Sequence, residues 1–260
     1  MRALFRKFFA DRGTHLAAMI AYFALLSFVP LSFLALAMLG FAGRANESSF
    51  VVTEIKRTFP DAPITDIVGL VREVQDNAAT LAGIGGAFLL WTALSLFSVL
   101  ESAFNIVYGR PNRGFLHGKA IASLLVLASL VTLFAALLVG SIGFAVGKHY
   151  APGFFDNGVV AYAFTLGAST LGVLAFVVST YYFLTNDALT VREVLPGAVL
   201  ATAGIETAFQ TLPLYIRYAS VNPALHIFGA TAILLVWLYA MANVLVFGAE
   251  LNWWLTKRSA

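Results

Sequence analysis

Six hydrophobic stretches, each long enough to cross a lipid bilayer, make up most of this chain of 260 residues. A spanning helix needs about 20 mostly apolar residues, because its backbone must form its hydrogen bonds internally. The chain is 60% hydrophobic and only 11% charged, whereas soluble domains have about 25% charged residues. We therefore expect an all-α polytopic membrane helix bundle, forming a single domain over residues 1–260. The six expected transmembrane helices cover residues 16–42, 81–107, 120–147, 159–184, 194–215 and 226–255.

The distribution of Lys and Arg predicts the orientation of these spans. With the N-terminus inside, the inside segments hold ten basic residues and the outside segments hold six. Cytoplasmic segments of membrane proteins carry the excess of positive charge, so both termini are expected in the cytoplasm. The first hydrophobic run, 16–42, is far longer than the core of a cleaved signal peptide and is expected to be a retained span.

The first outer loop, 43–80, is the only sizeable segment outside the predicted spans. Apolar residues recur in it at helical spacing, just after a proline that suits a helix start. These residues are Ile64, Ile67, Val68 and Val71, after Pro63. We expect two amphipathic helices here, which either lie over the outer mouth of the bundle or rest on the bilayer interface.

Three of the chain's 13 acidic residues lie inside predicted spans: Glu101, Glu206 and Glu250. A carboxylate in hydrocarbon costs several kcal/mol unless it is protonated, paired or hydrated. Each of the three is therefore expected either to serve a function or to have a structural partner. For Glu250 that partner is expected to be a basic residue of an inner loop.

Polar residues form stripes on two of the spans. In 81–107 a stripe about 120° wide is expected from the helical period, and in 226–255 a second polar face is expected. The first holds Trp91, Ser95, Ser98, Glu101, Ser102 and Asn105, and the second holds Tyr239, Asn243 and Glu250. Such stripes face the protein interior or a hydrated cavity.

The span 194–215 has two contrasting faces. A stripe of small residues predicts close packing against another helix, and comprises Gly197, Ala201, Gly204 and Ala208. Glu206 lies on the opposite side, near Thr202 and Gln210. Pro196 is expected in the first helical turn, where its missing N–H costs nothing.

These patterns predict that the second, fifth and sixth spans converge on a polar interior. The candidates for a substrate or proton pathway are Glu101, Ser102, Asn105, Glu206, Gln210, Asn243 and Glu250. Three basic residues of the inner loop, Arg110, Arg113 and Lys119, are candidates for binding lipid headgroups, unless they serve only to orient the protein.

Several kinds of chemistry are not indicated by the sequence. There is no cysteine, and the four histidines show no metal-ligand spacing such as HExxH. A G-x-S-x-G nucleophile turn is also missing. We therefore expect no metal, no cofactor and no catalytic residues, and we expect the protein not to be an enzyme.

Several motifs, in order along nearly the whole chain, resemble one family. They are His15 to Leu31, Trp91 to Tyr108, Arg113 to Phe115, Leu195 to Ala198, Phe228 to Ala230, Trp237 to Tyr239 and Gly248 to Asn252. This pattern resembles the YihY/virulence factor BrkB family. The resemblance implies a bacterial inner-membrane protein with six spans. Members have carried ribonuclease BN, serum-resistance and transporter labels.

The resemblance also implies a set of shared positions. They fall on Tyr22, Ser27, Pro30, Asn105, Pro196, Gly197, Gly229, Tyr239, Gly248 and Glu250. The residues themselves argue against a ribonuclease and against any nucleic-acid partner, because the chain has neither a soluble basic groove nor a stacking platform for RNA.

Two functions from different classes follow. The first is a transporter or exporter of a small solute or amphiphile through a polar cavity of the second, fifth and sixth spans, with a buried glutamate carrying protons. The alternative is a lipid-handling or envelope-assembly protein that docks an anionic lipid or a periplasmic partner through its outer loop.

Overall fold

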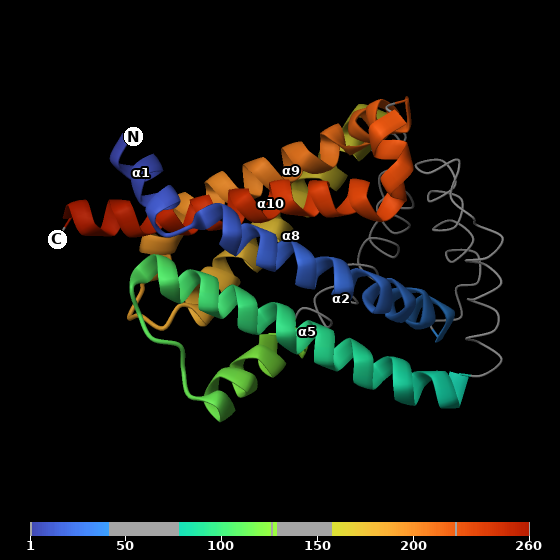
Figure 1. Cartoon of the computed structure of the whole chain (residues 1–260), viewed down its shortest axis with the longest axis horizontal. Helices are drawn as coiled ribbons and strands as arrows, with labels where there is room; N and C mark the ends of the chain where they lie inside the picture. Colours follow the sequence, from blue (N-terminus) through green and yellow to red (C-terminus); the bar gives the residue numbers. More distant parts are fainter. Residues whose placement is uncertain (1, 42–77, 126, 129–157, 222, 260) are drawn as a thin grey trace.

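The computed structural model describes residues 2–41, 78–125, 127–128, 158–221 and 223–259, and these residues are almost entirely helical (Figure 1). No strand occurs among them. The helices are α1 (Arg2–Ala10), α2 (Gly13–Phe41), α5 (Ala78–Tyr108), the short helix Phe115–Leu125, α8 (Gly158–Leu184), α9 (Val191–Val221) and α10 (Pro223–Ser259).

Five of the predicted spans coincide with the long helices α2, α5, α8, α9 and α10. These helices begin one to three residues before the predicted bounds, and their ends lie between one residue before and six residues after them. Only the start of the third predicted span, 120–147, is described, as part of the helix Phe115–Leu125. The predicted outer helices in 43–80 fall almost entirely outside the described residues. Among those residues, Thr231–Lys257 alone is long and apolar enough to qualify as a candidate membrane span, with a mean hydropathy of 2.1.

Helix α10 lies at the centre of the bundle and packs against α9, α2, α5 and α1 (Figure 1). The two chain termini lie at the same end of the molecule. The loops 109–114 and 185–190 lie at this end too, where a side chain of each loop donates a hydrogen bond to a backbone carbonyl of the other. We call it the inner end, because the sequence predicts that these four segments face the cytoplasm.

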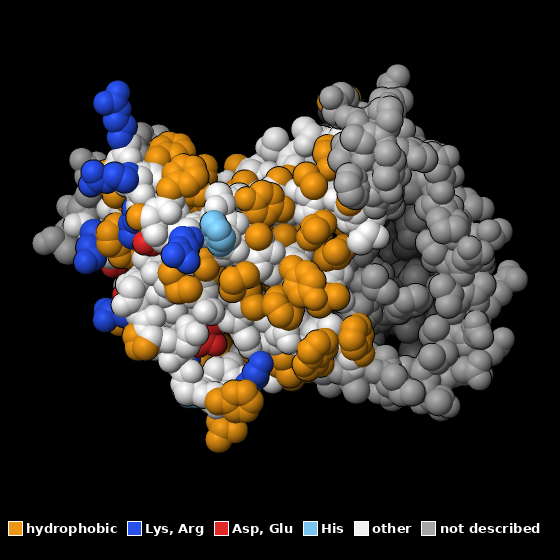
Figure 2. Space-filling view, viewed as in Figure 1, with side chains coloured by type: hydrophobic (Ala, Val, Ile, Leu, Met, Phe, Trp, Pro, Cys, Tyr) orange, Lys and Arg blue, Asp and Glu red, His pale blue; other side chains and the backbone are white. Residues whose placement is uncertain are grey.

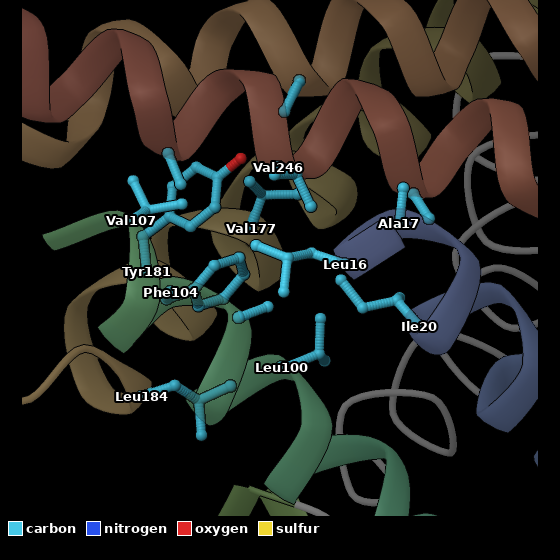
Figure 3. Packing of buried hydrophobic residues seen from close by; sticks show 14 of the residues in the cluster. Leu16, Ala17, Ile20, Leu100, Phe104, Val107, Val177, Tyr181, Leu184 and Val246 are labelled. Atoms are coloured by element: carbon cyan, nitrogen blue, oxygen red, sulfur yellow. The ribbon is translucent and has the colours of Figure 1, made fainter. Parts of the chain in front are cut away.

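A T-shaped pair of aromatic rings lies in the core near the inner end. The rings of Phe104 and Tyr181 have centroids 5.0 Å apart, and both side chains are fully buried. The hydroxyl of Tyr181 donates a 2.6 Å hydrogen bond to the backbone carbonyl of Leu245, so its polar end is also satisfied. Leu16, Leu100, Val107, Val177 and Val246 pack around these rings (Figure 3).

Helices α9 and α10 cross with almost no side chain between them. A Cβ atom on Gly197 would lie 2.0 Å from the carbonyl oxygen of Gly248, and one on Gly204 would lie 2.5 Å from a methyl carbon of Val244. Ala201 is fully buried in the same interface. The predicted packing stripe of small residues is therefore confirmed, and its partner is the last predicted span.

The expected position of Pro196 in the first turn of its helix is wrong. Helix α9 begins five residues earlier, at Val191, because Thr190 caps it. The Glu193 carboxylate accepts bonds from the backbone N–H (2.6 Å) and the hydroxyl (2.8 Å) of Thr190, and the first of these is one half of a capping box. Pro196 thus lies inside the helix, where its ring interrupts the backbone ladder.

A buried asparagine of α10 bonds to the backbone beside this proline. The side-chain oxygen of Asn252 accepts a 2.6 Å bond from the N–H of Gly197, and its amide donates a 3.0 Å bond to the carbonyl of Val194. Asn252 is fully buried. Asn252 therefore bonds to the backbone on both sides of Pro196 and joins α10 to this part of α9.

Helix α1 was not anticipated by the sequence analysis, which treated residues 1–15 only as a basic segment. Leu4 and Phe8, four residues apart, are buried, and Phe8 packs edge-on against Phe247 of α10 at 5.7 Å. Arg12 adopts a left-handed backbone conformation (φ 55°) in the turn that follows α1. A Cβ on the next residue, Gly13, would lie 2.4 Å from the Phe8 ring, so the turn presses directly on α1.

The glycine crossing gives a testable prediction. Gly197→Ala should lower the free energy of unfolding by about 3 kcal/mol or more, since overpacking typically costs about 1–3 kcal/mol and here the opposing atom is backbone. Gly172→Ala in α8 is the matched control, because nothing lies within 4 Å of its added methyl group. The measurement is the thermal unfolding midpoint of each purified variant in detergent. Equal midpoints for the two variants would contradict the close crossing.

Candidate functional site

Glu250 of α10 is completely buried and is paired with a lysine of the N-terminal helix. The ammonium of Lys7 lies 2.8 Å from Glu250 Oε2. Lys7 also donates to the carbonyl oxygen of Val107 at the end of α5 (2.8 Å) and contacts the carboxylate of Asp11. One lysine therefore connects α1, α5 and α10 at the inner end.

An aromatic ring completes the surroundings of this ammonium. Lys7 Nζ lies 4.1 Å from the centre of the Trp253 ring, within the range of a cation–π interaction. The other carboxylate oxygen of Glu250 is buried without a hydrogen-bond partner in the described part of the chain. Lys7 is thus the group that compensates this charge, and its loss would leave a buried carboxylate unpaired.

Glu101 of α5 is paired with the inner loop. Its Oε1 accepts a 3.2 Å bond from the backbone N–H of Arg113 and lies 3.6 Å from that residue's guanidinium. The same guanidinium donates to the carbonyl oxygens of Leu184 (2.7 Å) and Thr185 (2.9 Å) at the end of α8. Arg113 therefore joins α5 to the end of α8 through a planar, multiple-donor contact that suits Arg better than Lys.

Asparagines extend this connection. The fully buried Asn105 donates to Asn112 in the inner loop (3.0 Å) and accepts a 2.7 Å bond from the backbone N–H of Asn186. Asn112 in turn donates to Ser102 of α5 (3.3 Å), and Asn186 donates to the carbonyl of Pro111 (2.9 Å). The loops 109–114 and 185–190 are therefore bonded to each other and to α5.

The polar stripe of α5 faces these local partners. At its inner part, Glu101, Ser102 and Asn105 bond to the two loops, and further along α5, Ser98 accepts a 2.9 Å bond from Lys119 of the helix Phe115–Leu125. The stripe does contact protein, but in the described contacts its partners are not on the fifth and sixth predicted spans.

The three basic candidates for headgroup binding have different surroundings. The side chain of Arg113 is only 14% exposed and is engaged as described above. Arg110 is half-exposed and lies 2.8 Å from the carboxylate of Asp187. Lys119 is partly buried against Ser98 and the ring of Phe115. Headgroup binding by this loop stays a prediction, and Arg110 is its most accessible member.

Glu206 has different surroundings from the other two glutamates. It is half-buried on α9 and accepts a 2.9 Å bond from the hydroxyl of Ser169 on α8. Gln210, one turn along the helix, is exposed. Asn243 of α10 donates to the carbonyl of Tyr239 on its own helix (2.8 Å). The described contacts thus do not bring Glu101, Glu206 and Glu250 together, because each has its own partner on a different element.

Sequence reasoning missed two of the residues that organise this end. Lys7 was missed because the partner of Glu250 was expected in an inner loop, and the spacing of Leu4 and Phe8 indicates an amphipathic helix but not the helix against which it packs. Asn252 had no signal beyond its place in the motif Gly248 to Asn252. Among the described residues, no group of three or more His, Cys, Asp or Glu could hold a metal ion.

The comparisons with known proteins agree with this architecture of long apolar helices. The model of the family described as virulence factor BrkB matches residues 4–260. The chain belongs to the virulence factor BrkB family. The resemblance inferred from the motifs is thereby confirmed, and the chain is a helical membrane protein.

Two of the relatives of this BrkB-family chain carry the name UPF0761 membrane protein. It is 29% identical to a UPF0761 membrane protein of Chromohalobacter salexigens and 30% identical to one of Rhodospirillum rubrum. The matches cover 99% and 94% of this chain, but only 63% and 57% of those relatives, which are therefore much longer. The ribonuclease-like protein YfkH of Bacillus subtilis is 25% identical, with 99% of this chain and 95% of YfkH covered. No solved structure matches the chain.

The role of Arg113 in this BrkB-family protein can be tested by a conservative change. Arg113→Lys should lower the free energy of unfolding by about 2 kcal/mol, since lysine cannot keep the bonds to Glu101 and to two carbonyls at once. Arg110→Lys, in the same loop, should cost less than about 0.5 kcal/mol, because its ion pair is exposed. Denaturant unfolding in mild detergent measures both. Equal losses in the two variants would show that the loop does not depend on Arg113.

Proposed function

We propose that this chain is a six-span inner-membrane protein with both termini in the cytoplasm, a single domain over residues 1–260, that moves an amphiphile across the bilayer along the outer face of α8 and α9. The observation that carries the proposal is the pair formed by Glu206 and Ser169. Membrane location is supported by the family, and the route is proposed from the surroundings of this pair.

Glu206 lies near mid-depth of the proposed span and has no basic partner among its described contacts. Glu206 is the sixteenth of the 31 residues of α9 and so lies at the middle of that helix. Its described hydrogen-bond partner is a neutral hydroxyl, whereas the partners of Glu101 and Glu250 include basic residues. An intramembrane carboxylate without a basic partner is costly, and such residues commonly mark substrate or proton pathways.

The side chains near Glu206 suit a ligand that approaches from the outer face of α8 and α9. Gln210, one turn along α9, and Ser169 on α8 are exposed, and so is the large apolar side chain of Phe209 (49% exposed), three residues from Glu206 on α9. Polar groups next to exposed apolar groups suit a ligand that has both kinds of surface. An amphiphile can bring its headgroup to Glu206 while its tail stays in the hydrocarbon.

The contacts at the inner end do not favour the cavity between the second, fifth and sixth spans that the sequence suggested. A cavity lined by the second, fifth and sixth spans would have to open between α9 and α10, where Gly197 and Gly248 bring the two backbones into contact. At the inner end, Glu101 and Glu250 are buried and paired. We therefore place the path on the face of α9 that carries Glu206, with its carboxylate as the group that exchanges protons with the headgroup.

We place the protein among transporters rather than enzymes. The UPF0761 relatives are named as membrane proteins, and the description ribonuclease-like is part of the name of YfkH alone among the relatives given above. Docking of a periplasmic partner through the loop 43–80 stays a prediction, because almost all of that loop lies outside the described residues.

The test is lipid movement in proteoliposomes that contain the purified protein and a fluorescent phospholipid. Dithionite bleaches only the outer leaflet, so protein-dependent bleaching beyond half of the signal reports transfer between leaflets. Glu206→Gln should reduce the transfer rate at least about tenfold, which corresponds to about 1.4 kcal/mol on the barrier. Ser169→Ala should reduce it less, because the carboxylate remains.

Thr207→Val is the matched control, since Thr207 adjoins Glu206 but its hydroxyl bonds to the carbonyl of Ala203 in its own helix (2.7 Å). The control should keep the wild-type rate. Transfer by Glu206→Gln at the wild-type rate would remove Glu206 from the mechanism. Absence of transfer by the wild-type protein, for both anionic and zwitterionic lipids, would overturn the proposed function.

A further inference from the structure

A shallow groove of about 370 Å³ lies at the inner end between α1 and the last turns of α10. It is lined by Ala3, Arg6, Lys7, Ala10, Trp253 and Trp254. Two indole rings and two small alanines leave room beside the basic side chains. The sequence analysis assigned no role to this surface.

The groove is positively charged, and its charge is not all balanced within the protein. The ammonium of Lys7 is compensated by Glu250 and Asp11. Arg6 is exposed and has no carboxylate partner in the described part of the chain. Lys257 lies with its ammonium 5.4 Å from the centre of the Trp253 ring, at the edge of the groove. Figure 2 shows basic side chains gathered at this end of the molecule, whereas hydrophobic side chains cover its middle.

The apolar side of α1 supplies a second kind of contact. Phe5 and Phe9 are 50% and 64% exposed, although Leu4 and Phe8 on the same helix are buried. Phe5 and Phe9 are four residues apart, so their rings project on the same side of α1, which is not the side that lines the groove. A short helix with exposed aromatic rings beside arginines is typical of segments that lie in the membrane interface.

The position of the groove fits this interpretation. Trp253 and Lys257 are in the last part of the candidate membrane span Thr231–Lys257, where tryptophan and basic residues commonly meet the headgroup layer. A groove at this depth, with an uncompensated arginine at its mouth, matches a phosphate joined to acyl chains.

We propose that the groove between α1 and α10 binds the phosphate of an anionic phospholipid headgroup, with Arg6 as the main cation and Trp253 and Trp254 as its floor. This site is separate from Glu206 and does not depend on transport. It differs from the inner-loop candidates, because Arg113 is engaged within the protein.

The test is quenching of tryptophan fluorescence by brominated lipids in nanodiscs. The two other tryptophans are replaced (Trp91→Phe and Trp237→Phe), so that Trp253 and Trp254 report on the groove. Brominated phosphatidylglycerol should quench at a lower mole fraction than brominated phosphatidylcholine. Arg6→Gln should reduce this preference about fivefold, the effect expected of one basic residue near an anionic surface.

Arg192→Gln is the matched control, since Arg192 is exposed at the start of α9 and lies outside the groove. It should leave the preference unchanged. Equal quenching by the two lipids in the parent protein, or equal losses in Arg6→Gln and Arg192→Gln, would overturn the proposal. Loss of the preference in millimolar inorganic phosphate would also overturn it, because the groove would then take a free phosphate. Loss of lipid transfer in Glu206→Gln, with the lipid preference intact, leaves this proposal standing.

Discussion

The buried ion pair between Lys7 and Glu250 is the interaction on which the arrangement of the inner end depends. A carboxylate with no exposed surface is tolerated only when an opposite charge and hydrogen bonds compensate it, and removing one partner of such a pair costs about 3–5 kcal/mol. Here the compensating charge comes from a helix at the opposite end of the sequence. The pair therefore fixes α1 against α10 and, through the carbonyl of Val107, against α5.

The same constraint fixes the rotation of α10 about its axis. Gly248 and Asn252 are four residues apart and share one face of the helix, while Glu250 projects from the other. With Glu250 directed at Lys7, the opposite face presents Gly248 to Gly197 and Asn252 to the backbone around Pro196. The ion pair of Glu250 and the close crossing of α9 and α10 therefore depend on the same rotation of α10.

The pair of Glu101 and Arg113 likewise holds α5 against the inner loops. Glu206 is left as the intramembrane carboxylate whose described partner carries no charge.

Much of the fold followed from apolar run length and helical spacing. Five of the six predicted spans coincide with described long helices, because a long apolar run in a membrane protein has few alternatives to a helix. The small-residue stripe of Gly197, Ala201 and Gly204 correctly predicted a tight interface, since close backbone approach requires small side chains. The start of α9 was misplaced because Pro196 was taken as the first turn, although Thr190 and Glu193 already formed a capping pattern.

The partners of the buried glutamates could not be predicted from spacing. Glu250 and Lys7 are 243 positions apart, and only the tertiary fold brings them together. A helical period places Glu101 and Glu206 on polar faces, but it does not determine which neighbour each face meets. The loops 109–114 and 185–190, which return to bond with α5, had no sequence signal that distinguished them from solvent-exposed connections.

The most direct test of this account is thiol crosslinking between α1 and α10 in native membranes. The chain contains no cysteine, so Phe5→Cys with Phe247→Cys adds the only two thiols, in place of rings whose centroids are 5.2 Å apart. A short bis-maleimide, which bridges thiols farther apart than a disulfide allows, should link them, and adding Lys7→Met should reduce linking while adding Arg6→Gln should not. A pair that stays unlinked would contradict the docking of α1 on α10, and linking unaffected by Lys7→Met would show that the ion pair does not hold it there.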